Sequence, residues 1–521
     1  MRIGTFHSLC LDLLASQGRD VTIVDENESA ALADEILKEL GLKLSAKRFL
    51  QEVSQVKSGV CAQSAHPEAY ERYCARLREY GVCDFDDLLL DALALDTTFP
   101  YLLVDEFQDS NEIQYQLVQK WSEHGKSVFL IGDPDQSIYG FRGSSARCFE
   151  RFSEENPDAY KIRFLENYRS TPEVLSCALP LISRNDGPER VLSAVRPQGE
   201  RVRLLTAQDD FSQALFLAKE INRFVGGIDM LDVQTSQVRQ SGPLGFSDIA
   251  ILYRTHRQAE MIEKCLRIEG VPYVVTGRDS FLADDAVRGT VGFFRFLLHP
   301  ADLLSLRACL LTVLHCSPDT AQSLLECDWE SRTETQLPAS LRQEPALQRF
   351  SNFVQKYAPR VAKEKPLKLL QDWAEDTGLS EHTAVIKLLD AAVLYPDMPA
   401  LLHSLSLGKE GDVMRSGKRV YTADAVTLST LHGAKGLEFP VVFLCGVSKG
   451  TLPLEAPGRP ADLQEERRLF YVGMTRAKDE LILLTNDEPS PFLSDIPVSC
   501  LAKGTAVELN RPQPAQQLHF F

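Results

Sequence analysis

Apolar and polar positions follow two patterns along the chain, and each pattern predicts a different element. Short apolar runs that stop at polar residues predict buried parallel strands. Stretches with an apolar residue at every third or fourth position predict amphipathic helices. The strand-like runs lie at 101–104, 127–131, 160–165, 202–205, 248–253, 273–275, 425–428, 441–444 and 480–484. Because helical stretches separate most of these runs, the pattern favours parallel α/β units.

Two helical blocks interrupt the α/β pattern. The first holds helical stretches at 30–40, 46–56 and 67–80, and the second shows no strand-like run over more than a hundred positions. We therefore expect an α/β fold of two parallel-sheet domains, each with one helical insertion. The predicted parts are a first sheet domain at 1–24 and 85–165, its insertion at 25–84, a second sheet domain at 166–294 and 411–487, its insertion at 295–410, and a flexible tail at 488–521.

The run Tyr101–Val104 ends at two adjacent carboxylates, Asp105 and Glu106. In open α/β sheets, ligands bind outside the carboxyl ends of the strands. The two acids therefore lie where a nucleotide and its metal ion would bind. The alternative is a strand that ends in two solvated acids, and this stretch alone does not decide between them.

Composition narrows the protein class. A length of 521 residues predicts about three or four domains, and 44% hydrophobic with 25% charged residues is typical of a globular protein. No apolar run approaches the ~20 residues of a membrane span, and no signal-peptide layout is present. The twelve cysteines form no C-x-x-C pair, so the sequence does not indicate a zinc or iron–sulfur site. Dispersed free thiols fit a reducing cytoplasm. The net charge of −17 argues against coating nucleic acid with the whole surface but allows a local groove.

Five motifs then point to one family. In chain order they are V-D-E-F-Q-D at 104–109, I-G-D-P-D-Q-S-I-Y at 131–139, N-Y-R-S at 167–170, L-H-G-A-K-G-L-E-F at 431–439 and Y-V-G-M-T-R-A at 471–477. Their order and spacing resemble the UvrD/Rep family of superfamily 1 DNA helicases, which includes PcrA. The resemblance covers the chain from Thr5 to about Pro497. It implies two RecA-like motor domains with helical insertions, ATP and Mg²⁺ as cofactors, and single-stranded DNA and DNA junctions as partners.

The resemblance assigns the chemistry of ATP hydrolysis to the first motor domain. Hydrolysis needs a metal that bridges phosphates, an oriented water and cations that neutralise developing charge. By resemblance, Asp105 holds Mg²⁺, and Glu106 orients or deprotonates the attacking water. Gln136 resembles the γ-phosphate sensor that couples nucleotide state to the DNA groove.

The second motor domain supplies the cations of the predicted site. Arg169 and Arg476 resemble two arginine fingers that reach across a cleft to the first motor domain. Arginine suits this role because its planar fork stays charged and binds phosphate oxygens in pairs. Gly436 and Glu438 also match cofactor-binding positions of the family, and Glu438 matches the one that contacts the ribose.

The predicted DNA contacts combine aromatic rings with polar residues. Single strands are bound by bases that stack on aromatic rings above a groove that follows the backbone. The family usually has a tryptophan where this chain has Phe141, and a phenylalanine stacks with less area. By resemblance, the DNA-binding residues are Thr5, Phe6, His7, Tyr139, Phe141, Arg142, Thr430 and His432.

The phosphate loop G-x-x-x-x-G-K-[ST] is missing from residues 1–521. Gly125-Lys126-Ser127 resembles its end, but position 120 is lysine and the stretch joins a helix to a strand instead of a strand to a helix. In the family the loop lies upstream of Thr5. We therefore expect the first sheet to lack a strand and a helix, which leaves an exposed edge. We also expect residues 1–521 alone to bind ATP poorly.

Three explanations for the missing loop stay open. A misassigned start or a frameshift that split the gene is the one we favour. Alternatively, a separate chain supplies the segment, or the chain is a non-catalytic remnant that binds DNA or a partner. The second helical insertion is also short for the family. The G-I-G hairpin that grips duplex DNA in the family is not found near Leu310–Leu325, so duplex contact there is not predicted.

The tail ends in a glutamine followed by apolar residues. This ending resembles peptides that bind the bacterial sliding clamp, in which a glutamine and adjacent apolar side chains form the anchor. The residues concerned are Gln517, Leu518, Phe520 and Phe521. The alternative is an incidental apolar terminus.

Together these features predict an ATP-dependent DNA helicase or translocase that moves 3′ to 5′ on single-stranded DNA in repair or replication. The alternatives are one half of a split helicase and a DNA- or clamp-binding remnant without motor activity.

Overall fold

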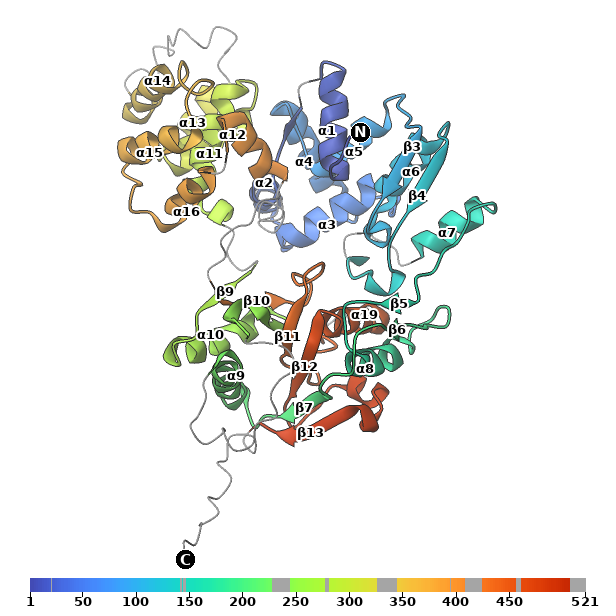
Figure 1. Ribbon diagram of the computed structural model, residues 1–521. Coiled ribbons are helices and arrows are strands. Elements are labelled where there is room, and N and C mark those ends of the chain that lie inside the picture. The colour runs from blue at the N-terminus through green and yellow to red at the C-terminus, as the bar shows by residue number, and fades with distance from the viewer. Residues whose placement is uncertain are drawn as a thin grey trace, which may run out of the picture.

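The chain forms two α/β regions and two helical blocks (Figure 1). The computed structural model describes residues 1–19, 21–140, 143, 147–226, 244–276, 281–325, 344–393, 395–407, 424–455 and 461–506. All strand pairings within its sheets are parallel. The predicted fold class, α/β with parallel sheets and helical insertions, is confirmed.

The second α/β region is built on a seven-stranded sheet with the order β13-β7-β12-β11-β8-β10-β9. Six of these strands were predicted from their apolar runs, within a few residues at each end. The strands are β7 (Val202–Thr206), β8 (Ile249–Tyr253), β9 (Tyr273–Val275), β10 (Val426–Thr430), β11 (Phe439–Leu444), β12 (Ala477–Thr485) and β13 (Leu501–Thr505).

Helices cover both faces of this sheet (Figure 1). On β8, Ala250 and Leu252 face one hydrophobic core, whereas Ile249 and Ile251 face the other. All five residues of β8 are buried, as expected for a parallel strand between two helical layers. The covering helices are α8 (Pro172–Ile182) and α19 (Leu463–Met474) on one face, and α9 (Asp210–Val225) and α10 (Ala259–Ile268) on the other.

The first α/β region has a sheet of two strands, β3 (Tyr101–Val104) and β4 (Ser127–Leu130). Its main core is formed with three helices, α1 (Phe6–Ser16), α5 (Phe85–Leu93) and α6 (Glu112–Ser122).

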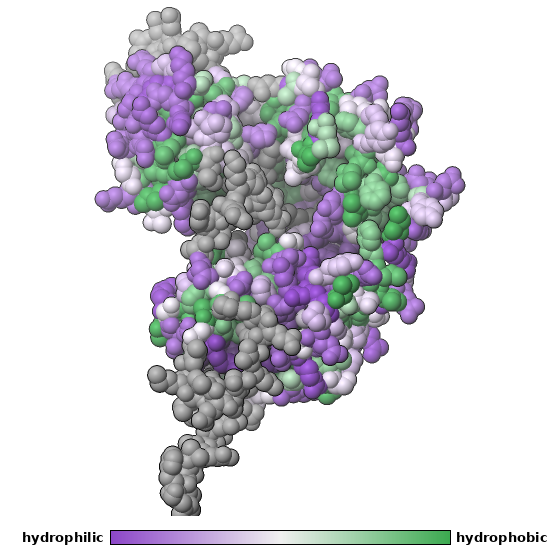
Figure 2. Space-filling view, in the orientation of Figure 1, coloured by the Kyte–Doolittle hydropathy of each residue, from purple (hydrophilic) through white to green (hydrophobic). Residues whose placement is uncertain are grey.

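The prediction that β3 and β4 are buried strands is wrong for alternate residues. Tyr101 is 70% exposed, Leu103 is 66% exposed and Phe129 is 50% exposed. Figure 2 shows apolar residues gathered on the surface in this part of the molecule. The reason is that the described helices cover one set of these side chains and leave the alternate set at the surface.

A strand predicted at 160–165 does not form. The strand assigned nearby, β5, consists of Glu166–Asn167 and pairs with β6 (Ser193–Ala194). Tyr160, Ile162 and Phe164 are exposed although their alternation fits one face of a strand. A strand needs a neighbour to accept and donate its backbone hydrogen bonds. In the described residues Leu165 O accepts from Ser193 N at 2.8 Å, but no paired strand is assigned along 160–164.

The first helical block matches the prediction. It consists of α2 (Glu26–Glu39), α3 (Ala46–Lys57) and α4 (Pro67–Glu79). A capping box between Asp25 and Glu28 starts α2. The chain enters the block through β1 (Thr22–Ile23) and leaves through the adjacent β2 (Val82–Cys83).

The second helical block has an aromatic core in which Phe293 stacks on Trp373 with ring centroids 4.1 Å apart. The predicted start at 295 is too late, because α11 begins at Asp285 and packs within this core from Val287 onward. The helices of the block are α11 (Asp285–Leu298), α12 (Leu303–Thr312), α13 (Pro318–Leu325), α14 (Pro345–Tyr357), α15 (Pro366–Thr377), α16 (Thr383–Ala392) and α17 (Met398–Leu407).

The two helical blocks contact each other. Arg295 of α11 forms a buried ion pair of 2.8 Å with Glu28 of α2. Arg307 of α12 lies 2.9 Å from Glu35, and Leu304 packs into the core of the first block. The two halves of the chain therefore meet through their helical insertions.

The predicted tail starts too early. The residues after 487 form η8 (Pro491–Asp495) and then β13, which pairs with β7. The prolines in this stretch favoured a loop, so the sequence did not predict the edge strand β13 (Leu501–Thr505). The proposed clamp-binding residues, Gln517, Leu518, Phe520 and Phe521, lie outside the described residues. Within the described part of the chain, no helix has the length and apolar character to cross a membrane.

Candidate functional site

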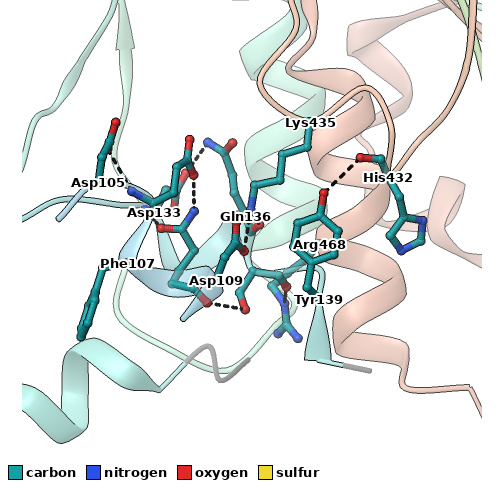
Figure 3. A network of polar contacts seen from close by, with 12 residues as sticks. Asp105, Phe107, Asp109, Asp133, Gln136, Tyr139, His432, Lys435 and Arg468 are labelled. Atoms are coloured by element: carbon teal, nitrogen blue, oxygen red, sulfur yellow. Dashed lines mark hydrogen bonds and ion pairs between the residues drawn. The ribbon is translucent and has the colours of Figure 1, made fainter. Parts of the chain in front are cut away.

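The polar residues that follow β3 and β4 form one connected group (Figure 3). Buried Gln108 donates from Nε2 to Glu106 Oε2 at 2.5 Å, and its Oε1 accepts from the backbone N–H of Asp133 at 3.1 Å. A Cβ at Gly132 would lie 2.0 Å from Gln108 Oε1, so this approach requires glycine. Gln108 was not among the predicted site residues, although it lies within a quoted motif.

Asp105 and Glu106 are exposed at the end of β3. Asp105 accepts the backbone N–H of Glu106 at 2.9 Å, and Glu106 adopts a left-handed φ of 52°. This conformation is uncommon outside glycine and costs about 1–3 kcal/mol, so the surrounding structure must hold it.

The donor set fits Mg²⁺. Among the described residues, no group of three or more His, Cys, Asp or Glu side chains is arranged to hold a metal ion. Mg²⁺ is usually bound by one or two carboxylates together with substrate phosphates. The exposed carboxylate of Asp105 offers the protein share of such a site.

Gln136 is the point at which the second α/β region contacts this group. It ends the short helix η2 (Pro134–Gln136), and its Nε2 donates to Asp133 Oδ2 at 2.8 Å. Its Oε1 accepts from Arg476 Nη2 at 3.1 Å, and its backbone carbonyl accepts from Lys435 Nζ at 2.6 Å. One residue of the first region thus receives hydrogen bonds from two cations of the second.

Arg476 is 1% exposed. Its Nε donates to Val472 O at 2.9 Å, and its Nη1 donates to Leu437 O at 3.2 Å. Burial, followed by the positive charge of Arg169, lowers the pKa of Arg476 to about 10. A desolvated cation interacts strongly with an approaching anion because water screens it little.

Arg169 and Glu438 are paired beside Arg476. Arg169 Nε donates to Glu438 Oε2 at 2.7 Å, and Lys478 Nζ lies 2.7 Å from the other carboxylate oxygen. The hydrogen bond from Lys478 lowers the pKa of Glu438, and Arg169 lowers it further. Gly436 lies two residues before Glu438 with a φ of 78°. The structure therefore brings together the cofactor residues predicted from the second region.

Lys435 and Asp109 form a contact between regions that the sequence did not predict. Lys435 is 7% exposed, and its Nζ lies 2.7 and 2.5 Å from the two Asp109 oxygens. The same ammonium lies 5.2 Å from the centre of the Tyr139 ring. Burial raises the pKa of Asp109, and Lys435 opposes this rise. Both residues lie in quoted motifs, but their sequence separation of 326 positions conceals the pairing.

Three predicted DNA-binding residues lie close together. The Tyr139 hydroxyl donates to His432 O at 3.3 Å, and the two rings lie 6.3 Å apart. Thr430 ends β10, and its Oγ1 accepts from Gly433 N at 3.1 Å. Phe141 and Arg142 lie outside the described residues.

The other predicted DNA-binding residues surround the start of α1. Thr5 caps this helix by accepting the N–H of Ser8, and His7 meets Phe85 edge-on at 5.0 Å. Phe6 stacks on Trp121 at 5.9 Å within the core of the first region. This packing accounts for Phe6 without DNA, and the DNA roles of these residues stay predictions.

Tyr168 is a further candidate that the sequence did not single out. Its ring is exposed next to Arg169, and its hydroxyl bonds to Glu166. An exposed ring beside a cluster of cations offers a face on which a flat aromatic group can stack. Its presence in the N-Y-R-S motif is the signal that could have identified it.

Comparisons with known proteins agree with this arrangement. Residues 1–157 match the UvrD/REP helicase N-terminal domain, and residues 162–358 and 328–488 match the UvrD-like helicase C-terminal domain. UvrD1 of Mycobacterium tuberculosis is 29% identical over 92% of this chain and 72% of its own length. PcrA of Bacillus subtilis and Rep of Escherichia coli are each 28% identical over 95% of this chain, and the matches cover 75% and 83% of their lengths. The chain therefore belongs to the UvrD/Rep family of DNA helicases.

Proposed function

We propose that this chain is the motor of an ATP-dependent DNA helicase or translocase that moves 3′ to 5′ on single-stranded DNA in the cytoplasm, in DNA repair or replication. The contact between Gln136 and Arg476 carries the proposal, because it connects the acidic strand ends of the first region to a buried cation of the second. The curated relatives UvrD1, PcrA and Rep are named ATP-dependent DNA helicases.

Each residue of the predicted site has a chemical task in this proposal. Asp105 would hold the Mg²⁺ that bridges the phosphates of ATP, and Glu106 would orient the attacking water. Arg169 and Arg476 would neutralise the charge that develops on the transferred phosphoryl group. Gln136 receives a hydrogen bond from Arg476, so it is placed to respond when that arginine binds phosphate.

The adjacent aromatic residues support DNA as the partner of the same junction. Tyr139 follows Gln136 by three positions and contacts His432 of the other region. A movement of Gln136 would therefore also move Tyr139, on which we expect a DNA base to stack. This proximity would link nucleotide binding to DNA binding without a long chain of intermediate residues.

The test measures phosphate release and directional movement on DNA. We expect phosphate release that rises when single-stranded DNA is added and is abolished in Glu106→Gln. Displacement of streptavidin from the 5′ but not the 3′ end of an oligonucleotide would establish 3′ to 5′ movement. Phosphate release that is indifferent to both DNA and the Glu106 substitution would reject the motor assignment.

The exposed β3–β4 face favours a second candidate. Tyr101, Leu103 and Phe129 form an apolar surface on a two-stranded sheet, which is a liability unless another segment covers it. In this candidate, a separate polypeptide with a phosphate loop completes the first region, and the chain is one half of a split helicase. Without such a polypeptide, the chain would be a DNA- or clamp-binding remnant.

The discriminating experiment begins with the DNA upstream of codon 1. An in-frame or frameshifted G-x-x-x-x-G-K-[ST] there would support a split or truncated helicase. The encoded segment would then be co-expressed with the chain, and stable co-purification is the expected result. Co-purification that persists in Leu103→Asp would argue against this face as the contact.

The sliding clamp is a further proposed partner, through Gln517, Leu518, Phe520 and Phe521. A glutamine with adjacent apolar side chains suits an anchor that fills a small pocket. We expect removal of residues 517–521 to abolish clamp binding in a pull-down with purified clamp, while single-stranded DNA binding is kept. Equal clamp affinity with and without the peptide would reject this partner.

A further inference from the structure

Arg190 lies in the loop after α8 and forms two parallel hydrogen bonds with Asp135 of the first region. Its Nε donates to Asp135 Oδ2 and its Nη2 donates to Asp135 Oδ1, both at 2.8 Å. The two side chains are 12% and 20% exposed. A paired arginine–carboxylate contact of this kind fixes direction as well as distance, and lysine does not reproduce it. Arg190 lies in none of the five motifs.

The second region holds Arg190 in place. Its Nη1 donates to Asn185 O at 3.0 Å, and its Nη2 also donates to Asp186 O at 3.1 Å. Asn185 is itself bound to α19, because its Nδ2 donates to Gln464 O at 2.8 Å. The guanidinium is thus fixed by the loop after α8, and α19 in turn holds this loop through Asn185.

The conformation of the loop after α8 leaves room for this guanidinium at Gly187. Gly187 adopts a φ of 134°, and a Cβ at this position would lie 3.1 Å from Arg190 Nη2. A side chain here would be strained and would crowd the arginine. The backbone conformation and the arginine contact therefore depend on the same glycine.

The partner of Arg190 is placed directly beside Gln136. Asp135 precedes Gln136 in η2, and the two backbone carbonyls that follow Asp135 are also held by the second region. Lys435 donates to Gln136 O at 2.6 Å, and Arg468 Nε donates to Ser137 O at 2.7 Å. Those two bonds fix the backbone, whereas Arg190 fixes the side chain of Asp135.

We infer that Arg190 is a positioning residue that ties the turn 133–137 to the second α/β region, so that movement of this region relocates Gln136. The inference deepens the proposed function and rests on it for its consequence in coupling ATP to DNA. Coupling of ATP binding to DNA binding requires an element with two arrangements, each favoured by a different ligand.

The test compares Arg190→Met and Asp135→Asn with a matched control, Arg360→Met. Arg360 forms a similar two-bond contact with Glu364, at 2.8 and 2.9 Å, in the second helical block. Hydrogen exchange is measured across residues 133–139, where Gln136 N–H donates to Asp133 O. We expect exchange about tenfold faster in Arg190→Met and Asp135→Asn, and unchanged in the control. Equal exchange in Arg190→Met and wild type would overturn the inference.

A second readout tests coupling, which a purely structural role would not change. The single-stranded DNA dissociation constant is measured with and without a non-hydrolysable ATP analogue and Mg²⁺. Coupled sites typically change affinity about 5–150-fold, and we expect this ratio to fall toward one in Arg190→Met. DNA affinity without nucleotide should stay within about twofold of wild type, and Arg190→Lys should recover only part of the ratio.

The double variant Arg190→Met with Asp135→Asn should be no worse than either single variant, because both remove the same contact. Additive losses would overturn the pairing. A wild-type ratio of one, measured at an analogue concentration that saturates the chain, would reject the proposed function and with it the coupling. Hydrogen exchange would then still decide whether Arg190 positions the turn.

Discussion

The two α/β regions differ in how completely their sheets are enclosed, although their strands look alike in sequence. The runs at 101–104 and 127–130 are as apolar as the run at 249–253. Ile249–Tyr253 is buried at every position between helical layers, whereas Tyr101 and Leu103 are exposed. The difference teaches that an apolar run reports the tendency to form a strand. Neighbouring elements decide which of its faces are buried.

The same contrast divides the candidate site. The exposed acids, Asp105 and Glu106, belong to the incompletely covered region, whereas buried Arg476 and Lys435 belong to the enclosed one. A cation that is held within a complete core needs little rearrangement to stabilise an anion. The enclosed region therefore supplies the buried, preorganised cations of the candidate site, and the first region supplies its exposed carboxylates.

The largest expected effect follows from this asymmetry. The pattern G-x-x-x-x-G-K-[ST] does not occur in residues 1–521, so we expect the phosphates of ATP to lack several of their hydrogen-bond donors. We expect phosphate release by residues 1–521 at least about 10³-fold slower than by an intact relative such as Rep in the same buffer.

The control for this measurement is Glu106→Gln, which separates the protein's own turnover from contaminating ATPases. Turnover that disappears in this variant yet equals that of Rep would contradict the prediction. It would show that the second region and the strand ends are sufficient for hydrolysis.

The next largest effect is expected at the buried ion pair between the two helical blocks, Arg295 with Glu28. Replacing Arg295 with methionine removes the cation that compensates the charges of buried Glu28 and Asp302, and among the described residues Asp302 Oδ2 already has no hydrogen-bond partner. We expect a loss of about 3–5 kcal/mol in the free energy of unfolding, measured by urea denaturation.

The matched control is Arg307→Met, because Arg307 pairs with Glu35 in a more exposed position of the same interface. Exposed pairs typically contribute about 0–1 kcal/mol. Equal losses for the two arginines would mean that the helical blocks separate before the protein unfolds.

Sequence patterns predicted the local elements well and the contacts between distant segments poorly. The positions of the second-sheet strands and of helix α3 follow from the pattern of apolar residues within each segment. The pairing of Lys435 with Asp109 and the hold of Arg190 on Asp135 depend on how two regions meet. No local pattern encodes such pairs. The strand β13 was missed because prolines precede it and its residues are only weakly apolar.

A third prediction compares one buried and one exposed strand residue directly. Ile251→Ala removes a fully buried side chain from the second sheet, and we expect a loss of about 2–5 kcal/mol in the free energy of unfolding. Leu103→Ala removes an exposed side chain from the first sheet, and we expect a change within about 0.5 kcal/mol. Urea denaturation of both variants checks the difference. A loss at Leu103 as large as at Ile251 would show that another segment covers this face.

The smallest expected effect is a pH dependence at the same interface between helical blocks. Burial raises the pKa of Glu28 from 4.5 to about 7, Asp25 and Asp302 add to the rise, and Arg295 opposes it. The folded protein then binds a proton that the unfolded chain has released, so Glu28 lowers stability as the pH rises from about 4.5 to about 7. We expect wild type to lose on the order of 2 kcal/mol relative to Glu28→Gln between pH 5 and pH 7.5. Parallel stability curves for the two proteins would show that Glu28 stays ionised throughout, and that Arg295 alone compensates its burial.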